Sequence, residues 1–151
     1  MLDEIDLALI ARLQQDGRLG LAELGQAVGL SSSAVNERVR KLLARGALRA
    51  IVALADPVAL GLGITAFVTV TLAAGADEDA FVAAVTADPA VMECHHVTGA
   101  ANYLLKVRVA DMAALETLLK RLKATGALAR SETQLALSTP KETTALPVGS
   151  L

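Results

Sequence analysis

The sequence predicts an α+β fold built from two small modules. Its 151 residues suit one ordinary domain or two small ones. Apolar residues recur every three or four positions over residues 1–45, which is typical of short helices, and from residue 64 onward strand-like alternation appears between helix-like runs. We therefore expect a helical module, a linker strand with a hinge, a larger mixed module and a C-terminal tail, at residues 1–50, 51–63, 64–139 and 140–151.

The first module divides into three short helices separated by glycine-containing breaks. Gly17 and Gly29 interrupt the apolar pattern after the first and second helices, and Gly46 ends the third. Ser31 or Ser32 can cap the third helix, because a serine hydroxyl accepts from the free amides of a helix start. Two helices joined by a short glycine-containing turn predict a helix-turn-helix, whose second helix enters the major groove of DNA.

The third helix carries a polar face opposite its apolar stripe of Val35, Val39 and Leu42. Arginine and asparagine make bidentate contacts to bases, and lysine and serine reach phosphate oxygens. The residues expected to contact DNA from this helix and its start are Ser31, Ser32, Ser33, Asn36, Glu37, Arg40 and Lys41. Arg38 lies beside the buried stripe, where it could instead pair with an acid of the first helix.

The charge distribution supports a polyanion-binding first module. The net charge is −2, yet residues 30–50 carry five basic side chains against one acid, a local balance of +4. Residues 51–151 carry seven basic and ten acidic side chains, a balance of −3. A basic segment beside an acidic remainder suggests a DNA-binding module joined to a module with another task. The alternative is a solvated helix with charge pairs such as Glu37 and Lys41.

The linker predicts a short strand followed by a hinge. Residues 48–54 are rich in β-forming side chains, and a turn at Asp56-Pro57 and the glycines Gly61 and Gly63 come after them.

The second module follows the order β-α-β-β-α-β. Helices capped by Asp77 and Asp111 separate strands expected at 64–72, 91–97, 102–109 and 128–137. This is the ferredoxin-like plan, in which both helices cover one face of the sheet. The other face, with Phe67 and alternating threonines, is left open and would suit a symmetric dimer.

Enzyme chemistry finds little support in the sequence. The motifs of serine hydrolases, P-loop and dinucleotide-binding proteins and zinc proteases are absent. Cys94 and His96 could touch one metal ion from a strand, but two ligands fall short of a zinc site, so a site shared across a dimer is the only metal alternative. Cys94 is otherwise a small buried side chain, and we expect neither an enzyme nor a cofactor.

Composition and the lack of targeting signals indicate the cellular compartment in which the protein works. Hydrophobic residues make up 54% and charged residues 20%, which excludes a disordered chain. A single cysteine cannot form an internal disulfide, no apolar run reaches the length of a membrane span, and Met1-Leu2-Asp3-Glu4 is unlike a signal peptide. We expect a folded cytoplasmic protein with no membrane partner.

In their order along the chain, several motifs resemble those of the leucine-responsive regulatory protein/AsnC family, the feast/famine transcription regulators. They comprise Leu2-Asp3-Glu4-Ile5-Asp6, Asp16-Gly17-Arg18, Leu30 to Val35, Arg38-Val39, Gly46-Ala47-Leu48, Asp56-Pro57, Gly61, VMECHHVTG (Val91 to Gly99), YLLKVRV (Tyr103 to Val109) and Asp111-Met112. The set covers nearly the whole chain. We count Arg18, in the second motif, among the expected DNA-binding residues.

The resemblance implies a winged or plain helix-turn-helix and a ferredoxin-like regulatory domain of the RAM or ACT type. It also implies dimers built through the open sheet face, and their assembly into tetramers or octamers. An amino-acid effector is implied at the loop made of Thr98, Gly99, Ala100, Ala101, Asn102 and Tyr103, whereas from the residues alone the loop also fits a plain β-turn. Ala100 and Asn102 replace family acids, which favours a neutral or carboxylate-only ligand, or none.

These observations predict a sequence-specific DNA-binding transcription regulator that acts as an oligomer on double-stranded DNA and is open to modulation by a small amino-acid-like molecule. One alternative is an architectural protein that organises DNA with little sequence preference and a steep salt dependence. Another is a small-molecule-binding module or enzyme that uses the sheet domain alone.

Overall fold

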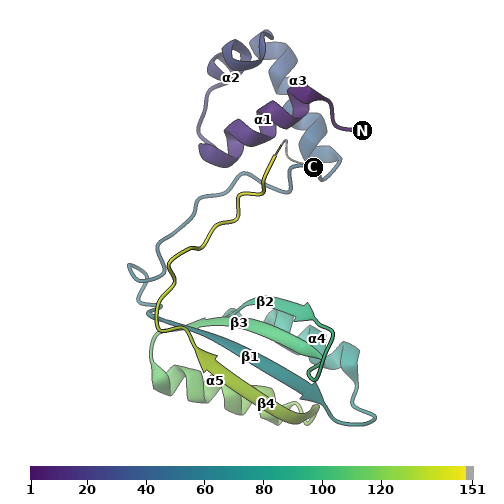
Figure 1. The fold of residues 1–151 in the computed structure, drawn as a ribbon, viewed down its shortest axis with the longest axis vertical. Helices are drawn as coiled ribbons and strands as arrows, with labels where there is room; N and C mark the ends of the chain where they lie inside the picture. Colours follow the sequence, from purple (N-terminus) through teal and green to yellow (C-terminus); the bar gives the residue numbers. More distant parts are fainter. Residues whose placement is uncertain (149–151) are drawn as a thin grey trace. The chain divides into compact units, whose positions relative to one another are not determined.

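The computed structural model describes residues 1–148 and separates into two compact units (Figure 1). One unit contains Met1–Leu54 with the C-terminal segment from Lys141, and the other contains Ala55–Pro140. The elements are α1 (Glu4–Gln15), α2 (Leu21–Val28), α3 (Ser32–Ala44), β1 (Ile64–Leu72), α4 (Glu78–Ala87), β2 (Val91–His96), β3 (Tyr103–Val109), α5 (Met112–Ala124) and β4 (Leu128–Leu135). None of the helices in residues 1–148 is long and apolar enough to cross a membrane.

Three capped helices enclose the core of the first unit. Asp3 accepts from the backbone of Asp6 while the Asp6 carboxylate reaches back to the backbone of Asp3, which closes a reciprocal cap on α1. Ser31 caps α3, since its Oγ accepts from the amide of Ala34 at 3.3 Å. The apolar side chains buried between the helices are Leu9, Leu13, Leu24, Val35, Leu42 and Leu48.

The turn between α2 and α3 depends on two glycines. Gly29 has φ of +70°, the left-handed conformation that ends a helix and favours glycine. Gly25 lies inside α2 and is buried, and a Cβ built there would stand 2.4 Å from the carbonyl oxygen of Leu30. The glycine thus lets the backbone of the turn approach α2 closely, which sets the path of the chain into α3.

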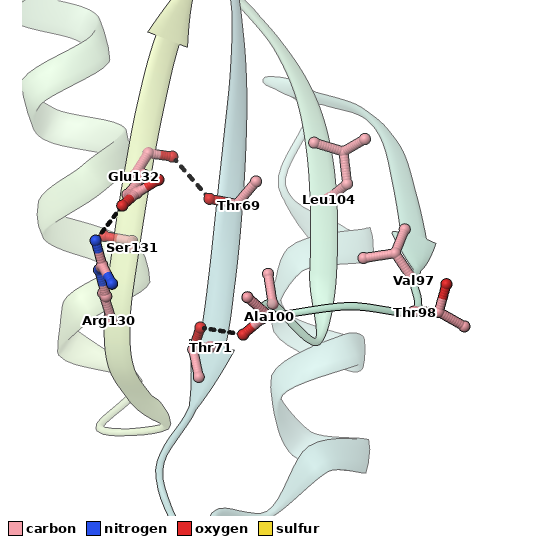
Figure 2. A pocket seen from close by; sticks show the side chains of 10 residues that line it. Thr69, Thr71, Val97, Thr98, Ala100, Leu104, Arg130, Ser131 and Glu132 are labelled. Atoms are coloured by element: carbon pink, nitrogen blue, oxygen red, sulfur yellow. Dashed lines mark hydrogen bonds and ion pairs between the residues drawn. The ribbon is translucent and has the colours of Figure 1, made fainter.

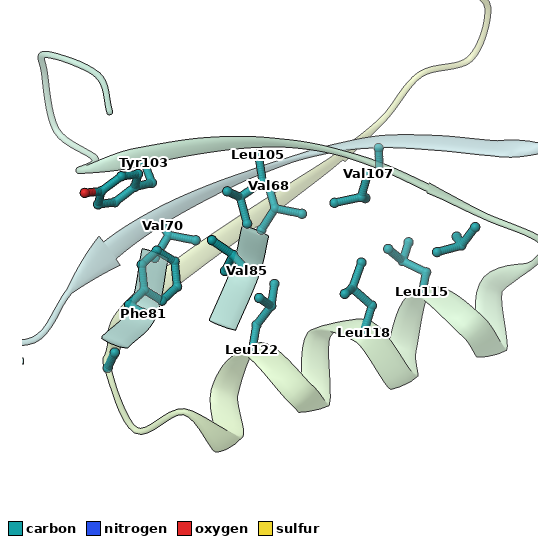
Figure 3. Close-up of a cluster of buried hydrophobic side chains, with 13 residues drawn as sticks. Val68, Val70, Phe81, Val85, Tyr103, Leu105, Val107, Leu115, Leu118 and Leu122 are labelled. Carbon is teal, nitrogen blue, oxygen red and sulfur yellow. The ribbon is translucent and has the colours of Figure 1, made fainter. Parts of the chain in front are cut away.

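The second unit has the predicted β-α-β-β-α-β order and one antiparallel sheet with the strand order β2-β3-β1-β4. The alternating positions Ala66, Val68 and Val70 of β1 are fully buried, and Val68 lies opposite Leu105 of β3. α4 and α5 bring Phe81 and Leu118 onto the same face (Figure 3). Phe67 is exposed and alternates with these buried positions, so it points to the other face of the sheet. Neither α4 nor α5 covers that face (Figure 1).

The expected linker strand is not formed. Residues 49–56 have neither helical nor strand structure, and Val52 and Leu54 are exposed. A strand is stabilised by hydrogen bonds to a neighbouring strand, and none of the four strands in residues 1–148 pairs with this segment. The β-forming side chains were therefore insufficient by themselves to produce the strand.

The C-terminal segment runs back to the first unit. The Gln14 side chain of α1 donates through Nε2 to the Leu146 carbonyl at 3.0 Å and accepts through Oε1 from the Leu146 amide at 2.7 Å. Residues 149–151 of the expected tail lie outside the described residues. The described part of the tail is thus a partner of α1.

Candidate nucleic-acid interface and ligand pocket

The face of α3 predicted to contact DNA is fully exposed. We call it the DNA face, and its members are Ser31, Ser32, Ser33, Asn36, Glu37, Arg40 and Lys41. Lys41 Nζ lies 2.6 Å from Glu37 Oε1, so these two charges are paired along the helix, and the pair lowers the pKa of Glu37. Within residues 1–148, the side chains of Asn36 and Arg40 make no hydrogen bond or ion pair. They are therefore free to contact a ligand.

Two other arginines of this segment turn away from the DNA face and are held by α1. Arg38 donates through Nη1 to Asp3 Oδ2 at 2.7 Å and to Asp6 Oδ1 at 2.9 Å, and Arg45 donates through Nη2 to Asp6 Oδ2 at 3.3 Å. The side chain of Asp6 is only 7% exposed. The predicted pairing of Arg38 with an acid of the first helix is confirmed, and Arg45 joins it.

These pairs reduce the positive charge that the unit offers to a polyanion. Over Met1–Leu54 there are seven basic and six acidic side chains, which leaves a net charge of +1. The local balance of +4 over residues 30–50 is therefore mostly offset by residues 1–29, where five acids stand against two arginines. The DNA face carries polar hydrogen-bonding groups and little excess charge.

Arg18 lies apart from α3, in the turn after α1. Its amide and its Nε both donate to Asp16 Oδ1, at 2.8 Å and 3.2 Å, and these bonds lower the pKa of Asp16. The Arg18 side chain is 92% exposed, so the guanidinium remains accessible.

The second unit has a hollow of about 390 Å³ on the open face of its sheet, which we call the sheet pocket (Figure 2). It lies over β1 and β4 beside the loop that joins β2 to β3. Its lining residues are Thr69, Thr71, Val97, Thr98, Ala100, Ala101, Leu104, Arg130, Ser131 and Glu132. Thr71 Oγ1 donates to the Ala100 carbonyl at 3.4 Å, and Arg130 forms an ion pair with Glu132. The pocket thus combines small side chains with one charge of each sign.

Of the predicted effector residues, Thr98, Ala100 and Ala101 line the sheet pocket, while Gly99 makes the turn with φ of +115°. Asn102 lies outside the lining. Its side-chain Oδ1 accepts from the backbone amide of Leu72 at 2.8 Å, and its backbone amide donates to the Val70 carbonyl at 2.8 Å. Because its side-chain acceptor joins the hairpin to the end of β1, the expectation that Asn102 offers this group to a ligand does not fit the geometry.

Tyr103 faces the helices and not the sheet pocket. It is buried, its hydroxyl donates to Glu78 Oε1 at 2.6 Å, and His96 stacks on its ring with centroids 4.9 Å apart. The hydrogen bond to Glu78 raises the pKa of Tyr103 to about 12. Tyr103 alternates with Leu105 and Val107 along β3, and this parity places it in the core.

The sequence-based prediction missed Arg130 and Glu132. They reach the pocket because β1 and β4 pair so that Thr71 lies opposite Arg130 and Thr69 opposite Glu132. Opposite residues of an antiparallel pair share a face of the sheet. The strand order was predictable from the β-α-β-β-α-β plan, but the register that brings these residues together was not.

The Cys94-His95-His96 run divides between the two faces of the sheet. Cys94 lies opposite Leu105 and His96 opposite Tyr103, both on the helix-covered side, and burial raises the pKa of the Cys94 thiol. His95 Nε2 instead lies 3.0 Å from Glu93 Oε2. Over the described part of the chain, no three histidine, cysteine or acidic side chains are grouped to hold a metal ion.

Comparison with known proteins matches both units. Residues 2–43 match the AsnC-type helix-turn-helix domain and residues 65–146 match the Lrp/AsnC ligand binding domain. The chain is 35% identical to the HTH-type transcriptional regulator FL11 of Pyrococcus horikoshii over 97% of each chain, and 40% identical to the regulator LrpA of Mycobacterium tuberculosis over 91% of each. A transcriptional regulator of Neisseria meningitidis, crystallised with L-methionine, superposes with a TM-score of 0.91 at 33% identity over 97% of each chain.

Proposed function

The chain belongs to the Lrp/AsnC family of DNA-binding transcription regulators, and we propose that it reads promoter DNA through the DNA face of α3 and responds to a small zwitterion bound in the sheet pocket. The protein is a sequence-specific regulator that works as an oligomer, and not an enzyme. We further propose that it acts in the cytoplasm, where the DNA of prokaryotes such as those of its relatives lies.

The observation that carries the DNA proposal is that Asn36 and Arg40 are exposed and unpaired on one side of α3. Asparagine can bond the N6 and N7 of adenine, and arginine the O6 and N7 of guanine, in each case with two hydrogen bonds. The three serines at the start of α3 are suited to phosphate oxygens, as is Lys41 once it leaves Glu37. Arg18 would add a phosphate contact from the turn after α1.

The low net charge of the first unit favours sequence-specific reading over DNA organisation. A protein that wraps DNA without base contacts depends on many phosphate neutralisations and therefore on a large excess of basic side chains. This unit offers +1 over Met1–Leu54. Hydrogen bonds to base edges must then supply much of the affinity, which makes it depend on sequence.

Selection of bound sequences from a random DNA pool tests the DNA proposal. An enriched motif is expected, and Arg40→Ala should weaken binding to it by about 1 to 3 kcal/mol while Lys41→Ala mainly lowers the salt dependence. Arg121→Ala is the matched control, because that arginine lies on α5 and is bonded to Asp88. Recovery of unrelated fragments with equal affinity would support the architectural alternative, and unchanged affinity in both α3 variants would reject the proposed face.

The effector proposal depends on the Arg130 and Glu132 pair in the sheet pocket. A free amino acid carries a carboxylate and an ammonium group, and the pair offers a partner of opposite sign to each. Glu132 can thus take the place of the acids absent at Ala100 and Asn102, which revises the expectation of a ligand without an ammonium group. The Neisseria meningitidis neighbour crystallised with L-methionine supports an amino acid as the first ligand to test.

Calorimetry with L-methionine and a panel of amino acids tests the effector proposal. Glu132→Gln and Arg130→Gln should each weaken binding by about tenfold or more, because each removes a charge-assisted hydrogen bond worth roughly 1.5 to 3 kcal/mol. Glu116→Gln is the control, since Glu116 pairs with Lys120 on the exposed side of α5. Binding that both pocket variants leave unchanged would place the ligand elsewhere.

A further inference from the structure

We infer that Asp6 is a specificity-determining residue, which limits sequence-independent binding to DNA by holding Arg45 and Arg38 against α1. We call the three side chains the Asp6 clamp. Asp6 belongs to α1, and the hydrogen-bonding partners of its carboxylate in residues 1–148 are Asp3, Arg38 and Arg45, none of which belongs to the DNA face. It therefore acts through the arginines as a positioning residue. The inference rests on the proposed DNA face for its comparison residue, Lys41, and otherwise on the clamp alone.

The clamp is asymmetric in how firmly it holds the two arginines. Arg38 has two acceptors, Asp3 at 2.7 Å and Asp6 at 2.9 Å. The Arg45 side chain has Asp6 as its one hydrogen-bonding partner within residues 1–148, at 3.3 Å, and remains 49% exposed. Loss of the Asp6 charge would therefore leave Arg38 attached and release Arg45.

The position of Arg45 at the end of α3 would let its released guanidinium reach DNA. Arg38 and Arg45 are seven residues apart, which is about two helical turns, so both start on the side of α3 that faces α1. Arg45 is the C-cap of α3, where the chain leaves the helix and a long side chain can turn outward. A freed guanidinium at this end can reach a phosphate, which every DNA sequence provides equally.

Because the first unit has a low net charge, the release of Arg45 alone would change its attraction to DNA phosphates. With a net charge of +1 over Met1–Leu54, one more available cation is a large relative change in the attraction to phosphates. Because this attraction is independent of sequence, it raises the affinity for competing DNA and lowers the ratio of specific to non-specific binding. Holding Arg45 on a buried acid keeps that ratio high.

The test is the salt dependence of binding to a random duplex, measured on the full-length protein. Asp6→Asn is compared with Glu4→Gln, which removes the same charge from the same turn of α1. The Glu4 side chain makes no hydrogen bond or ion pair in the described residues. One additional phosphate contact steepens the slope of log K against log salt by about 0.9, or about threefold in affinity between about 50 and about 200 mM salt. We expect this change in Asp6→Asn and not in Glu4→Gln.

The double variant Asp6→Asn with Arg45→Gln should return to the slope of the unmodified protein, an outcome that a general loosening of the fold would not produce. Equal slopes in Asp6→Asn and Glu4→Gln, or a steep slope that persists in the double variant, would overturn the inference. Circular dichroism establishes whether each variant is folded.

A second comparison applies if Asp6→Asn does not fold. Arg45→Gln should leave the random-DNA slope unchanged because its charge is already held, while Lys41→Gln, which removes a proposed phosphate contact, should lower it by about 0.9. An equal drop in both would overturn the role of the clamp. An unchanged slope in Lys41→Gln alone would reject the proposed DNA face, while a fall of about 0.9 in Arg45→Gln would overturn the role of the clamp whatever Lys41→Gln does.

Discussion

Gln14 and Leu146 are 132 positions apart, yet the side-chain amide of the first bonds both backbone groups of the second. The Gln14 side chain behaves as a short piece of neighbouring strand, since it presents a donor and an acceptor to one residue's carbonyl and amide. The C-terminal segment is thereby attached to α1, which also carries Asp6 of the Asp6 clamp. Residues after Pro140 thus contribute to the unit that binds DNA.

Gln14→Ala should lower the free energy of unfolding of the first unit by about 1 kcal/mol, the usual net value for exposed hydrogen bonds of this kind. Thermal melting checks this result, with Gln15→Ala as the control because Gln15 is exposed and its side chain makes no hydrogen bond in residues 1–148. In a chain that ends at Pro140, Gln14→Ala should have no further effect. A full effect in the shortened chain would show that Gln14 acts through other contacts.

Gly25→Ala should destabilise the helix-turn-helix by about 2 kcal/mol or more. The added Cβ would stand 2.4 Å from the backbone oxygen of Leu30, and a backbone atom cannot move away as a flexible side chain can. Gly20→Ala is the matched control, because its Cβ would meet nothing within 4 Å and its φ of −69° is ordinary. Chemical denaturation measures both, and equal losses would contradict the steric argument.

Local signals predicted the first unit well, since the chemistry of a turn lies within a few residues. Gly29 predicts the end of α2, and Ser31 predicts the cap of α3. The position of Arg38 beside the apolar stripe predicts its pairing with an acid of the first helix, which is Asp6. The structure differs from the prediction where a feature depends on contacts between residues far apart in the sequence. Residues 48–54 have the composition of a strand but no partner in the described chain, and the approach of Arg130 to the loop at Ala100 depends on the register of distant strands.

One failure could have been avoided from the sequence. Strand residues alternate between faces, so Tyr103 must share the buried side with Leu105 and Val107. The side chains of residues 98–103 therefore cannot all face one binding site. The resemblance to known regulators identified the loop, but the direction of each side chain is a property of this chain's own strand.

Tyr103 should ionise with a midpoint near 12 in the folded protein, compared with an ordinary value of about 10. It is the chain's only tyrosine, so the ultraviolet absorbance of tyrosinate reports it directly. Because the folded pKa is raised, the stabilisation from the bond to Glu78 is complete below about pH 10 and is lost as the pH rises toward 12.

Two variants check the cause of that shift. Glu78→Gln should move the midpoint down toward 10, since the negative charge that disfavours tyrosinate is gone. Tyr103→Phe should show a weaker loss of stability between about pH 10 and 12 than the unmodified protein. A midpoint near 10 in the unmodified folded protein would contradict the hydrogen bond.

We expect the open face of the sheet to be the surface through which two copies associate. Phe67 is 36% exposed near its centre, between Lys106 of β3 and Gln134 of β4. Phe67→Lys should leave the single chain folded, because the side chain already meets solvent there, but it would place a charge in the interface beside Lys106. Burying an unpaired charge costs about 3 kcal/mol or more, so the dimer should weaken by about a hundredfold.

Sedimentation velocity at micromolar concentration measures the change in dimerisation caused by Phe67→Lys. Met112→Lys is the control, since Met112 is 56% exposed on α5, away from this face. A monomeric unmodified protein, or a Phe67→Lys variant of unchanged size, would show that the open face is not the interface.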